Sequence, residues 1–228
     1  MRDHLEELRL VKRHQHHPLI HQIHKEHRIS HKTLFYVKEY GPHSHIAKTI
    51  IAESIKVLLF ASIISSVGGF ALEQIKTLFV SIAPLIILLP ALNDLIGDFG
   101  TIVSSHFSTL LHEGKIGLRW WENPELRKLF LQVLLIAVFF AALGAGLSLF
   151  ISQFFGTGVD ANTAMKILFI AVLDILLVVG ILFLVAILAG QYFYKKGEDP
   201  NNFLIPITTS IADFGNMLLL AGLVILFF

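Results

Sequence analysis

The sequence contains no cysteine, and charged residues make up only 15% of its 228 positions. Without cysteine the chain has no disulfide framework, no thiolate metal site and no cysteine nucleophile. It also lacks a recognisable nucleophile–base pair, an HExxH zinc motif and a phosphate-binding loop, so we do not expect an enzyme. Apolar residues dominate instead: 54% of the chain is hydrophobic and the mean hydropathy is +0.70. This composition predicts an all-α integral membrane protein.

The first 48 residues differ from the rest and predict a basic, His-rich cytoplasmic arm (residues 1–48) ahead of a transmembrane domain (residues 49–228). The arm holds nine Lys and Arg residues and ten of the twelve His residues. Four of them could line one helix face and bind zinc or another borderline cation: His17, His21, His24 and His31. The alternative is a solvated arm whose basic residues touch anionic lipid. Nucleic acid is not an expected partner, because no aromatic-rich patch or fold motif accompanies the basic residues.

From residue 49 onward the chain is a series of long apolar runs, which must be helical if they cross a bilayer. We expect five transmembrane helices, at about Thr49–Phe70, Ile75–Leu111, Leu126–Phe150, Ala164–Tyr192 and Phe203–Phe228. The second run is too long for one simple crossing. Its candidate bend points are Pro84, Pro90, Gly97 and Gly100.

Lys and Arg residues are distributed unevenly between the two ends of these helices. The arm has nine, and the loops after the second and fourth helices add Lys115, Arg119, Arg127, Lys128, Lys195 and Lys196. The opposite side has only Lys76 and Lys166. The positive-inside rule therefore predicts a cytoplasmic N-terminus, and five crossings put the C-terminus outside. We expect a multi-pass protein of the cell membrane.

Acidic residues interrupt the apolar runs, where a carboxylate is costly and by default marks a functional site. A helical rise of about 1.5 Å per residue puts Asp213 and Asp174 near the bilayer midplane. Counted from the outer end of the second helix, the same rise puts Asp94 and Asp98 near the cytoplasmic mouth. These two residues are one turn apart and share a helix face. Glu53, one turn into the first helix, is expected at the same mouth.

Other roles stay open for two of these acids, since Glu53 could pair with Lys56 and Asp94 could bond locally within a bent helix. For Asp213 and Asp174 a cation path is the economical explanation, because the membrane core offers them no basic partner. Oxygen ligands without Cys, and without His in the core, favour magnesium, calcium or manganese. Magnesium sheds water reluctantly and is held by few carboxylates through retained waters, which suits such sparse acids. These arguments do not exclude a proton relay.

Two motifs resemble the signatures of the MgtE magnesium channels and their eukaryotic solute-carrier relatives. The first is PALNDLIGDFGTIVSSHFST followed by GKIG, and the second is EDPNNFLIPITTSIADFGN. The resemblance covers about residues 48–228, including Glu53–Ser54 at the start of the first helix. It implies that Asp213 is the pore aspartate that holds hydrated magnesium. Asn93, Gly97, Thr209 and Asn216, which lie in the two motifs, are expected to support the ion path.

The chain departs from this family pattern in ways that affect its function. Asp98 falls where the family usually has Asn, which makes the inner mouth more acidic, and Asp174 falls where many members have Asn or Asp. The regulatory domains of the bacterial channels have no counterpart here, so their gating cannot be transferred. The eukaryotic relatives carry two five-helix halves. One half therefore implies a homodimer with the ion path near its two-fold axis.

The sequence thus predicts a homodimeric magnesium channel or transporter, with Mg²⁺ as the transported ion and as the ligand of the intramembrane acids. Two alternatives remain open. One is a sodium- or proton-coupled exchanger of divalent cations, because midplane acids also serve proton relays. The other is a membrane-anchored metal sensor in which the His-rich arm does the work.

Overall fold

The computed structural model describes residues 46–116, 120–196 and 199–228. Its helices are α4 (Ile46–Gln74), α5 (Lys76–Ser81), α6 (Ala83–His112), the short 3₁₀ helix η1 (Trp120–Glu122), α7 (Pro124–Phe154), α8 (Ala161–Lys196) and α9 (Pro200–Phe227). Five of them are long and apolar enough to cross a membrane. The expected all-α architecture with five transmembrane helices is confirmed. The arm, residues 1–45 in particular, lies outside the described residues.

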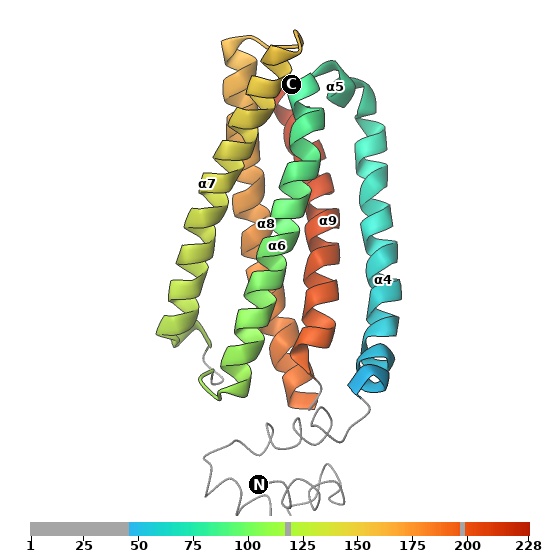
Figure 1. Cartoon of the computed structure of the whole chain (residues 1–228), viewed down its shortest axis with the longest axis vertical. Helices are drawn as coiled ribbons and strands as arrows, with labels where there is room; N and C mark the ends of the chain where they lie inside the picture. The colour runs from blue at the N-terminus through green and yellow to red at the C-terminus, as the bar shows by residue number, and fades with distance from the viewer. Residues whose placement is uncertain (1–45, 117–119, 197–198) are drawn as a thin grey trace, which may run out of the picture.

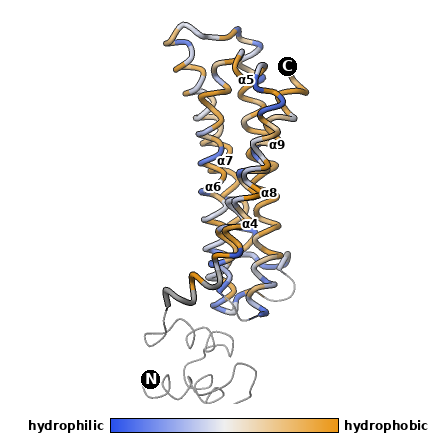
Figure 2. The backbone as a smooth tube through the Cα atoms, turned by 90° about the vertical axis from the view of Figure 1, so that its right-hand side faces the viewer, coloured by the Kyte–Doolittle hydropathy of each residue, from blue (hydrophilic) through white to orange (hydrophobic). Residues whose placement is uncertain are grey.

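The long helices stand side by side along the longest axis of the molecule (Figure 1). α4 lies at one edge and contacts α9, whereas α7 lies at the other edge and contacts α6 and α8. The remaining three, α6, α8 and α9, all contact one another and form the centre of the bundle. Apolar residues run along the whole length of the helices, and hydrophilic residues lie at both ends and at a few points between them (Figure 2). In each helix the backbone N–H and C=O groups form hydrogen bonds with one another, as the hydrocarbon core of a bilayer requires.

The second apolar run is two helices rather than one. The short α5 ends at Ser81, and α6 starts after Ile82, whose φ of −116° and ψ of 82° are not helical. Pro84 lies in the first turn of α6, where proline is tolerated because its missing N–H would be unpaired anyway. Pro90, by contrast, lies inside α6 and does not end it. Of the candidate bend points, only the position of Pro84 coincides with the break.

Small residues let the central helices approach closely. A Cβ added to Gly190 of α8 would lie 2.7 Å from the Phe107 ring of α6 and 3.1 Å from Leu204 of α9. One end of the bundle is therefore packed around this glycine. A Cβ added to Gly100 of α6 would similarly lie 3.3 Å from Cβ of Thr208 in α9. These contacts fix the register of α6, α8 and α9, and this register determines which polar side chains meet in the middle of the bundle.

Candidate functional site

Asp213 of α9 is the centre of a polar cluster that joins three helices. Asn93 of α6 donates a hydrogen bond from Nδ2 to Asp213 Oδ1 at 2.7 Å. Ser65 of α4 donates from Oγ to Asp213 Oδ2 at 3.1 Å. Each carboxylate oxygen thus has a donor from a different helix, while the Asp213 side chain keeps partial exposure to the surface. The arrangement holds the carboxylate in place and leaves lone pairs for a further ligand.

A second amide fixes the orientation of the first. Asn216 lies one turn after Asp213 on the same helix face, and its Nδ2 donates to Asn93 Oδ1 at 2.9 Å. Because Asn93 accepts on its oxygen, its nitrogen is the atom directed at Asp213. The side chain of Asn216 is fully buried, and its Oδ1 has no hydrogen-bond partner among the described residues. The two amides therefore form a short chain that supports the carboxylate from inside the bundle.

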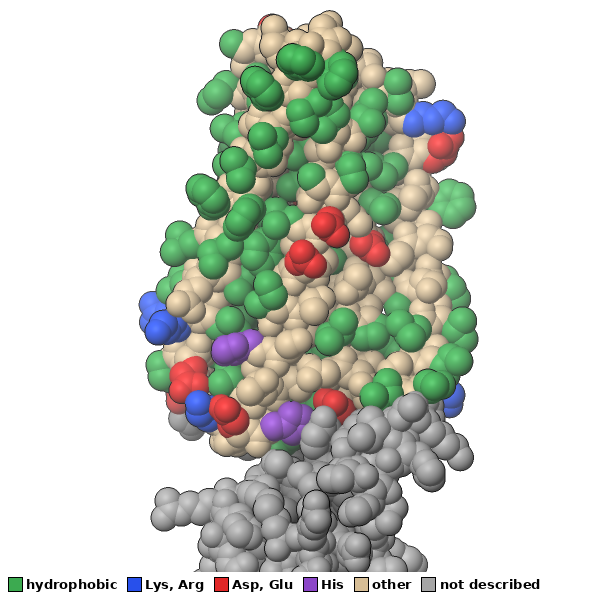
Figure 3. Space-filling view, viewed as in Figure 1, with side chains coloured by type: hydrophobic (Ala, Val, Ile, Leu, Met, Phe, Trp, Pro, Cys, Tyr) green, Lys and Arg blue, Asp and Glu red, His purple; other side chains and the backbone are tan. Residues whose placement is uncertain are grey.

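Asp94 and Asp98 lie beside this cluster, which corrects their expected depth. Both are exposed on α6, and Asp94 directly follows Asn93, the residue that bonds Asp213. They therefore sit in the middle of the bundle, at about the level of Asp213, and not near one of its ends. The error came from counting along one long helix, whereas α6 starts only at Ala83. Acidic side chains gather at mid-height on the face that carries α6 and α9 (Figure 3).

Asp174 of α8 is placed differently from the other acids. Its side chain is fully buried, and neither carboxylate oxygen has a hydrogen-bond partner within the described part of the chain. It therefore does not belong to the hydrogen-bonded cluster of Asp213. A buried carboxyl group without a partner is costly. We therefore expect Asp174 to be protonated or to contact an ion or a water molecule.

The remaining predicted residues contribute less to this geometry. Gly97 is partly exposed, a Cβ there would meet nothing within 4 Å, and its carbonyl accepts a 3.2 Å hydrogen bond from Thr101 Oγ1. Thr209 is partly exposed on α9. Glu53 lies within α4, but its side chain is outside the described part of the structure, as is any pair it forms with Lys56. The structure thus joins Asp213, Asn93 and Asn216 by hydrogen bonds. Of the predicted residues with described side chains, Asp94, Asp98, Asp174, Gly97 and Thr209 lie outside this network.

Two polar contacts between helices were not anticipated from the sequence, one in the Asp213 cluster and one apart from it. Ser65 is one of three α4 serines close together in the sequence, but within the described structure Ser62 and Ser66 bond only to carbonyls of their own helix. Deeper in the bundle, Ser104 of α6 meets Thr208 of α9 at 3.0 Å between hydroxyl oxygens. Hydroxyl residues in an apolar helix indicate contacts between helices, but the sequence does not show which of several hydroxyl groups faces a neighbouring helix.

Comparison with known proteins agrees with the two motifs. The chain is 26% identical to human solute carrier family 41 member 2 over 76% of its length, and 28% identical to the chicken protein over 77%. It spans only 32% of the length of these relatives. No solved structure is a significant match. The model of the MgtE family, described as a divalent cation transporter, matches residues 89–223, which is more than half of the chain and includes Asn93, Asp94, Asp98, Asp174 and Asp213. The chain is therefore a multi-pass membrane protein that belongs to the MgtE family of divalent cation transporters.

Proposed function

We propose that this chain forms a homodimer that moves hydrated magnesium past Asp213. The observation that carries the proposal is the Asp213 carboxylate itself, held by Asn93 at 2.7 Å and Ser65 at 3.1 Å in the middle of a membrane bundle. Both of its hydrogen bonds come from neutral donors, so its negative charge is not neutralised within the cluster. A cation delivered along a water-filled path would supply the missing charge.

The exposed pair of acids supports both the path and the dimer. Asp94 and Asp98 are exposed in the middle of α6, where a lipid-facing carboxylate costs roughly 2.5–3.5 kcal/mol on insertion scales. This cost is avoided if their face borders water or a second protein surface. A second copy of the chain, related by a two-fold axis, would cover the face and bring two sets of acids around one aqueous path. The relatives are about three times as long as the matched segment, which leaves room in them for a second such bundle.

The ligand set favours a hydrated ion. The described residues contain no group of three or more His, Cys, Asp or Glu side chains placed to hold a metal ion. One copy therefore offers a carboxylate with amide and hydroxyl neighbours rather than a closed cage. Magnesium is the divalent ion that most strongly retains its waters and is bound through few carboxylates. Asn93 and Asn216 would then contact the waters of the ion as well as Asp213.

A coupled exchanger is the second candidate, and Asp174 is the observation that favours it. A carboxyl group that is fully buried without a partner can take up and release a proton as its surroundings change. Exchange of the divalent cation for protons or sodium would give Asp174 a function that a simple channel does not require. A membrane-anchored sensor would depend on the His-rich arm, which lies outside the described residues.

The orientation of the chain is part of the proposal. The start of α4 and the C-terminus lie at opposite ends of the bundle (Figure 1). The excess of Lys and Arg before α4, and after α6 and α8, supports a cytoplasmic N-terminus and an external C-terminus. A reporter fused to the C-terminus that is active only in the cytoplasm would contradict this orientation.

Ion flux into liposomes tests the function directly. The purified chain is reconstituted in vesicles that contain a magnesium-sensitive dye, and external Mg²⁺ is added with and without a sodium or a pH gradient. A channel gives flux that follows the Mg²⁺ gradient and the membrane potential alone. An exchanger gives flux that changes with the second gradient. The absence of flux under all three conditions would exclude transport by this chain and leave the sensor.

A further inference from the structure

An apolar groove lies between α7 and α8 on the opposite edge of the bundle from α4. Its volume is about 510 Å³, within the range of roughly 300–1,000 Å³ that is common for ligand sites. Phe130 and Phe183 form part of its wall, with ring centroids 4.8 Å apart. Leu177, Ile181 and Leu184 line it while remaining 43–50% exposed. The groove is therefore open toward the surroundings of the bundle, which for these helices is the bilayer.

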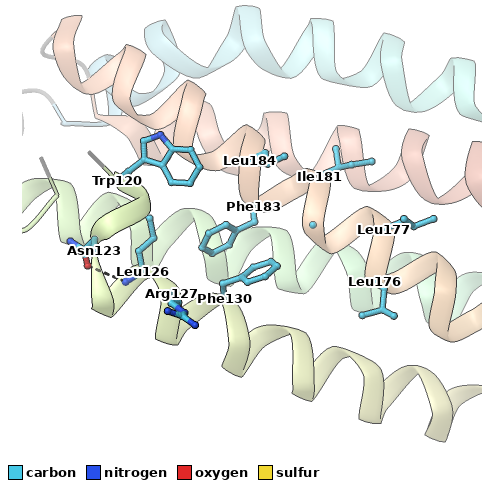
Figure 4. Close-up of a pocket in the computed structure, with 11 residues that line it drawn as sticks. Trp120, Asn123, Leu126, Arg127, Phe130, Leu176, Leu177, Ile181, Phe183 and Leu184 are labelled. Carbon is cyan, nitrogen blue, oxygen red and sulfur yellow. Dashed lines mark hydrogen bonds between the residues drawn. The ribbon is translucent and has the colours of Figure 1, made fainter. Parts of the chain in front are cut away.

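The polar residues of the groove are confined to one end. Trp120, Asn123 and Arg127 lie there, whereas Leu176 and Leu177 lie at the far end (Figure 4). Asn123 caps α7, because its side chain accepts from the N–H groups of Glu125 and Leu126 at 2.9 and 3.1 Å. Two of the free N–H groups at the start of α7 therefore already have a hydrogen-bond acceptor. The guanidinium of Arg127 remains as the charged group at this end.

Arg127 has a second cation, Lys128, beside it in the sequence, and two acids, Glu122 and Glu125, precede it. Arg127 and the adjacent Lys128 are exposed, and neither forms an ion pair within the described ranges. Glu125, the nearest acid in sequence, is 3.5 Å from Lys115. Lys115 also pairs with Glu113, whose hydrogen bond and charge are the main causes that raise the pKa of Lys115, and Glu125 adds to them. The charge of Glu125 is thus balanced by Lys115, which does not line the groove.

We propose that this groove binds one acyl chain of an anionic phospholipid, with the phosphate at Arg127, the cationic residue that lines its polar end. An apolar slot open to the bilayer accepts the chain, and a cationic, Trp-containing end lies where a headgroup would sit. Basic residues near a membrane surface attract anionic lipid by an amount that corresponds to roughly fivefold in affinity for each residue. The lipid belongs to the leaflet at the end of the bundle where α7 begins. The site is separate from the Asp213 cluster and does not depend on the proposed transport.

Gly180 provides a way to fill the groove without disturbing the bundle. It lines the groove, and a Cβ at this position would meet nothing within 4 Å. A Gly180→Leu side chain therefore occupies the space of the acyl chain rather than that of another residue. Gly146 of α7 is the matched control, because it is exposed, has equally open space and does not line the groove.

Trp120 makes the test direct because it lines the groove and is one of only two tryptophans. In a Trp121→Phe background, the full chain is reconstituted in phosphatidylcholine nanodiscs with increasing fractions of lipid brominated on its acyl chains. Bromine quenches tryptophan fluorescence at short range. We expect brominated phosphatidylglycerol to reach half-maximal quenching at about a fivefold lower fraction than brominated phosphatidylcholine. Raising the salt concentration reduces this preference.

The variants decide between a specific site and ordinary contact with lipid. Arg127→Gln should bring the phosphatidylglycerol curve close to the phosphatidylcholine curve, because it removes the headgroup partner. Gly180→Leu should weaken quenching by both lipids, and Gly146→Leu should change neither curve. Equal curves for the two lipids in the parent protein would overturn the proposal, as would an unchanged preference in Arg127→Gln. Arg127→Gln alters only an exposed side chain, so its result stands even if Gly180→Leu does not fold.

Discussion

Asn93 Nδ2 donates a 2.7 Å hydrogen bond to Asp213 Oδ1 and thereby joins α6 to α9 between the two motifs that identify the family. The donor is neutral, so it orients the carboxylate without cancelling its charge. A charged partner such as Lys would have neutralised the carboxylate and removed the basis for the proposed cation site. Asp213 therefore combines a fixed position with an unmatched charge, which is what a site for a passing cation requires.

Asp213→Asn is expected to reduce divalent flux by about tenfold or more without unfolding the protein. The amide oxygen can still accept from Asn93, and the amide nitrogen can donate to Ser65, so both contacts survive. Only the charge is lost, and contacts to charged groups worth roughly 1.5–3 kcal/mol correspond to a factor of ten or more. Flux in proteoliposomes and thermal unfolding in detergent measure the two effects.

The matched control is Asp160→Asn, which makes the same chemical change at an exposed residue just before α8. Asp160 accepts from the N–H groups of Asn162 and Thr163, and asparagine can replace it in that role. Flux should remain at the wild-type level. Wild-type magnesium flux in Asp213→Asn across the whole concentration range would refute the role of Asp213.

Ser65→Ala should weaken the response to low Mg²⁺ concentrations, because Asp213 loses its partner on α4. The effect is expected to be about threefold to tenfold in half-saturating concentration, since one hydrogen bond is worth roughly 0.5–1.5 kcal/mol. Ser66→Ala is the control, as Ser66 bonds only to the Ser62 carbonyl. If both variants shift the concentration dependence equally, the Ser65 contact has no specific role.

The sequence predicted the number of membrane-spanning helices well, because apolar length alone determines which segments can cross a bilayer. It placed Asp94 and Asp98 at the wrong depth, because Pro84 was only one of four candidate bend points and the depth was counted along an unbroken helix, whereas the chain leaves the helical conformation at Ile82. A depth estimate along an assumed straight helix cannot include such a break.

The site was predicted as a set of residues but not as a geometry. The cost of acids in an apolar run pointed to Asp213 and Asp174, although only Asp213 has hydrogen-bond partners in the described structure. The pairing of Asp213 with Asn93 and Ser65 depends on the register of three helices. That register is set by close contacts such as Gly190 against Phe107, which have no periodic signature in the sequence.

Asp94→Asn and Asp98→Asn are expected to reduce flux mainly at low Mg²⁺ concentration. Both carboxylates are exposed and attract the ion by their field rather than by a direct fixed contact. Added salt shortens the range of this attraction to about 10 Å or less. The difference from wild type should therefore shrink as salt is added. A large loss of flux at saturating Mg²⁺, unchanged by salt, would instead place these acids at the binding site itself.

Asp174→Asn separates the channel from the exchanger. In a channel the substitution should cause a smaller loss of flux than Asp213→Asn, because Asp174 is buried without a hydrogen bond to the Asp213 cluster. In a proton-coupled exchanger it should abolish the dependence of flux on a pH gradient while Mg²⁺ still binds. Measuring flux with and without the gradient in the wild type and the variant distinguishes the two. An unchanged response to the gradient would exclude Asp174 as the coupling group.

Gly190→Ala should destabilise the bundle, although alanine is intrinsically the better helix former by roughly 1 kcal/mol. The added methyl would stand 2.7 Å from the Phe107 ring of α6 and 3.1 Å from the Leu204 side chain of α9, so these side chains or their helices must shift. Overpacking of this kind costs typically about 1–3 kcal/mol and lowers the unfolding temperature in detergent. Gly146→Ala, whose methyl enters open space, should show the opposite sign and raise it slightly. Since Gly190 fixes the register that brings Asn93 to Asp213, Gly190→Ala should also lower flux. Equal unfolding temperatures for the two variants would show that the central helices yield at this point, and that the register is fixed elsewhere.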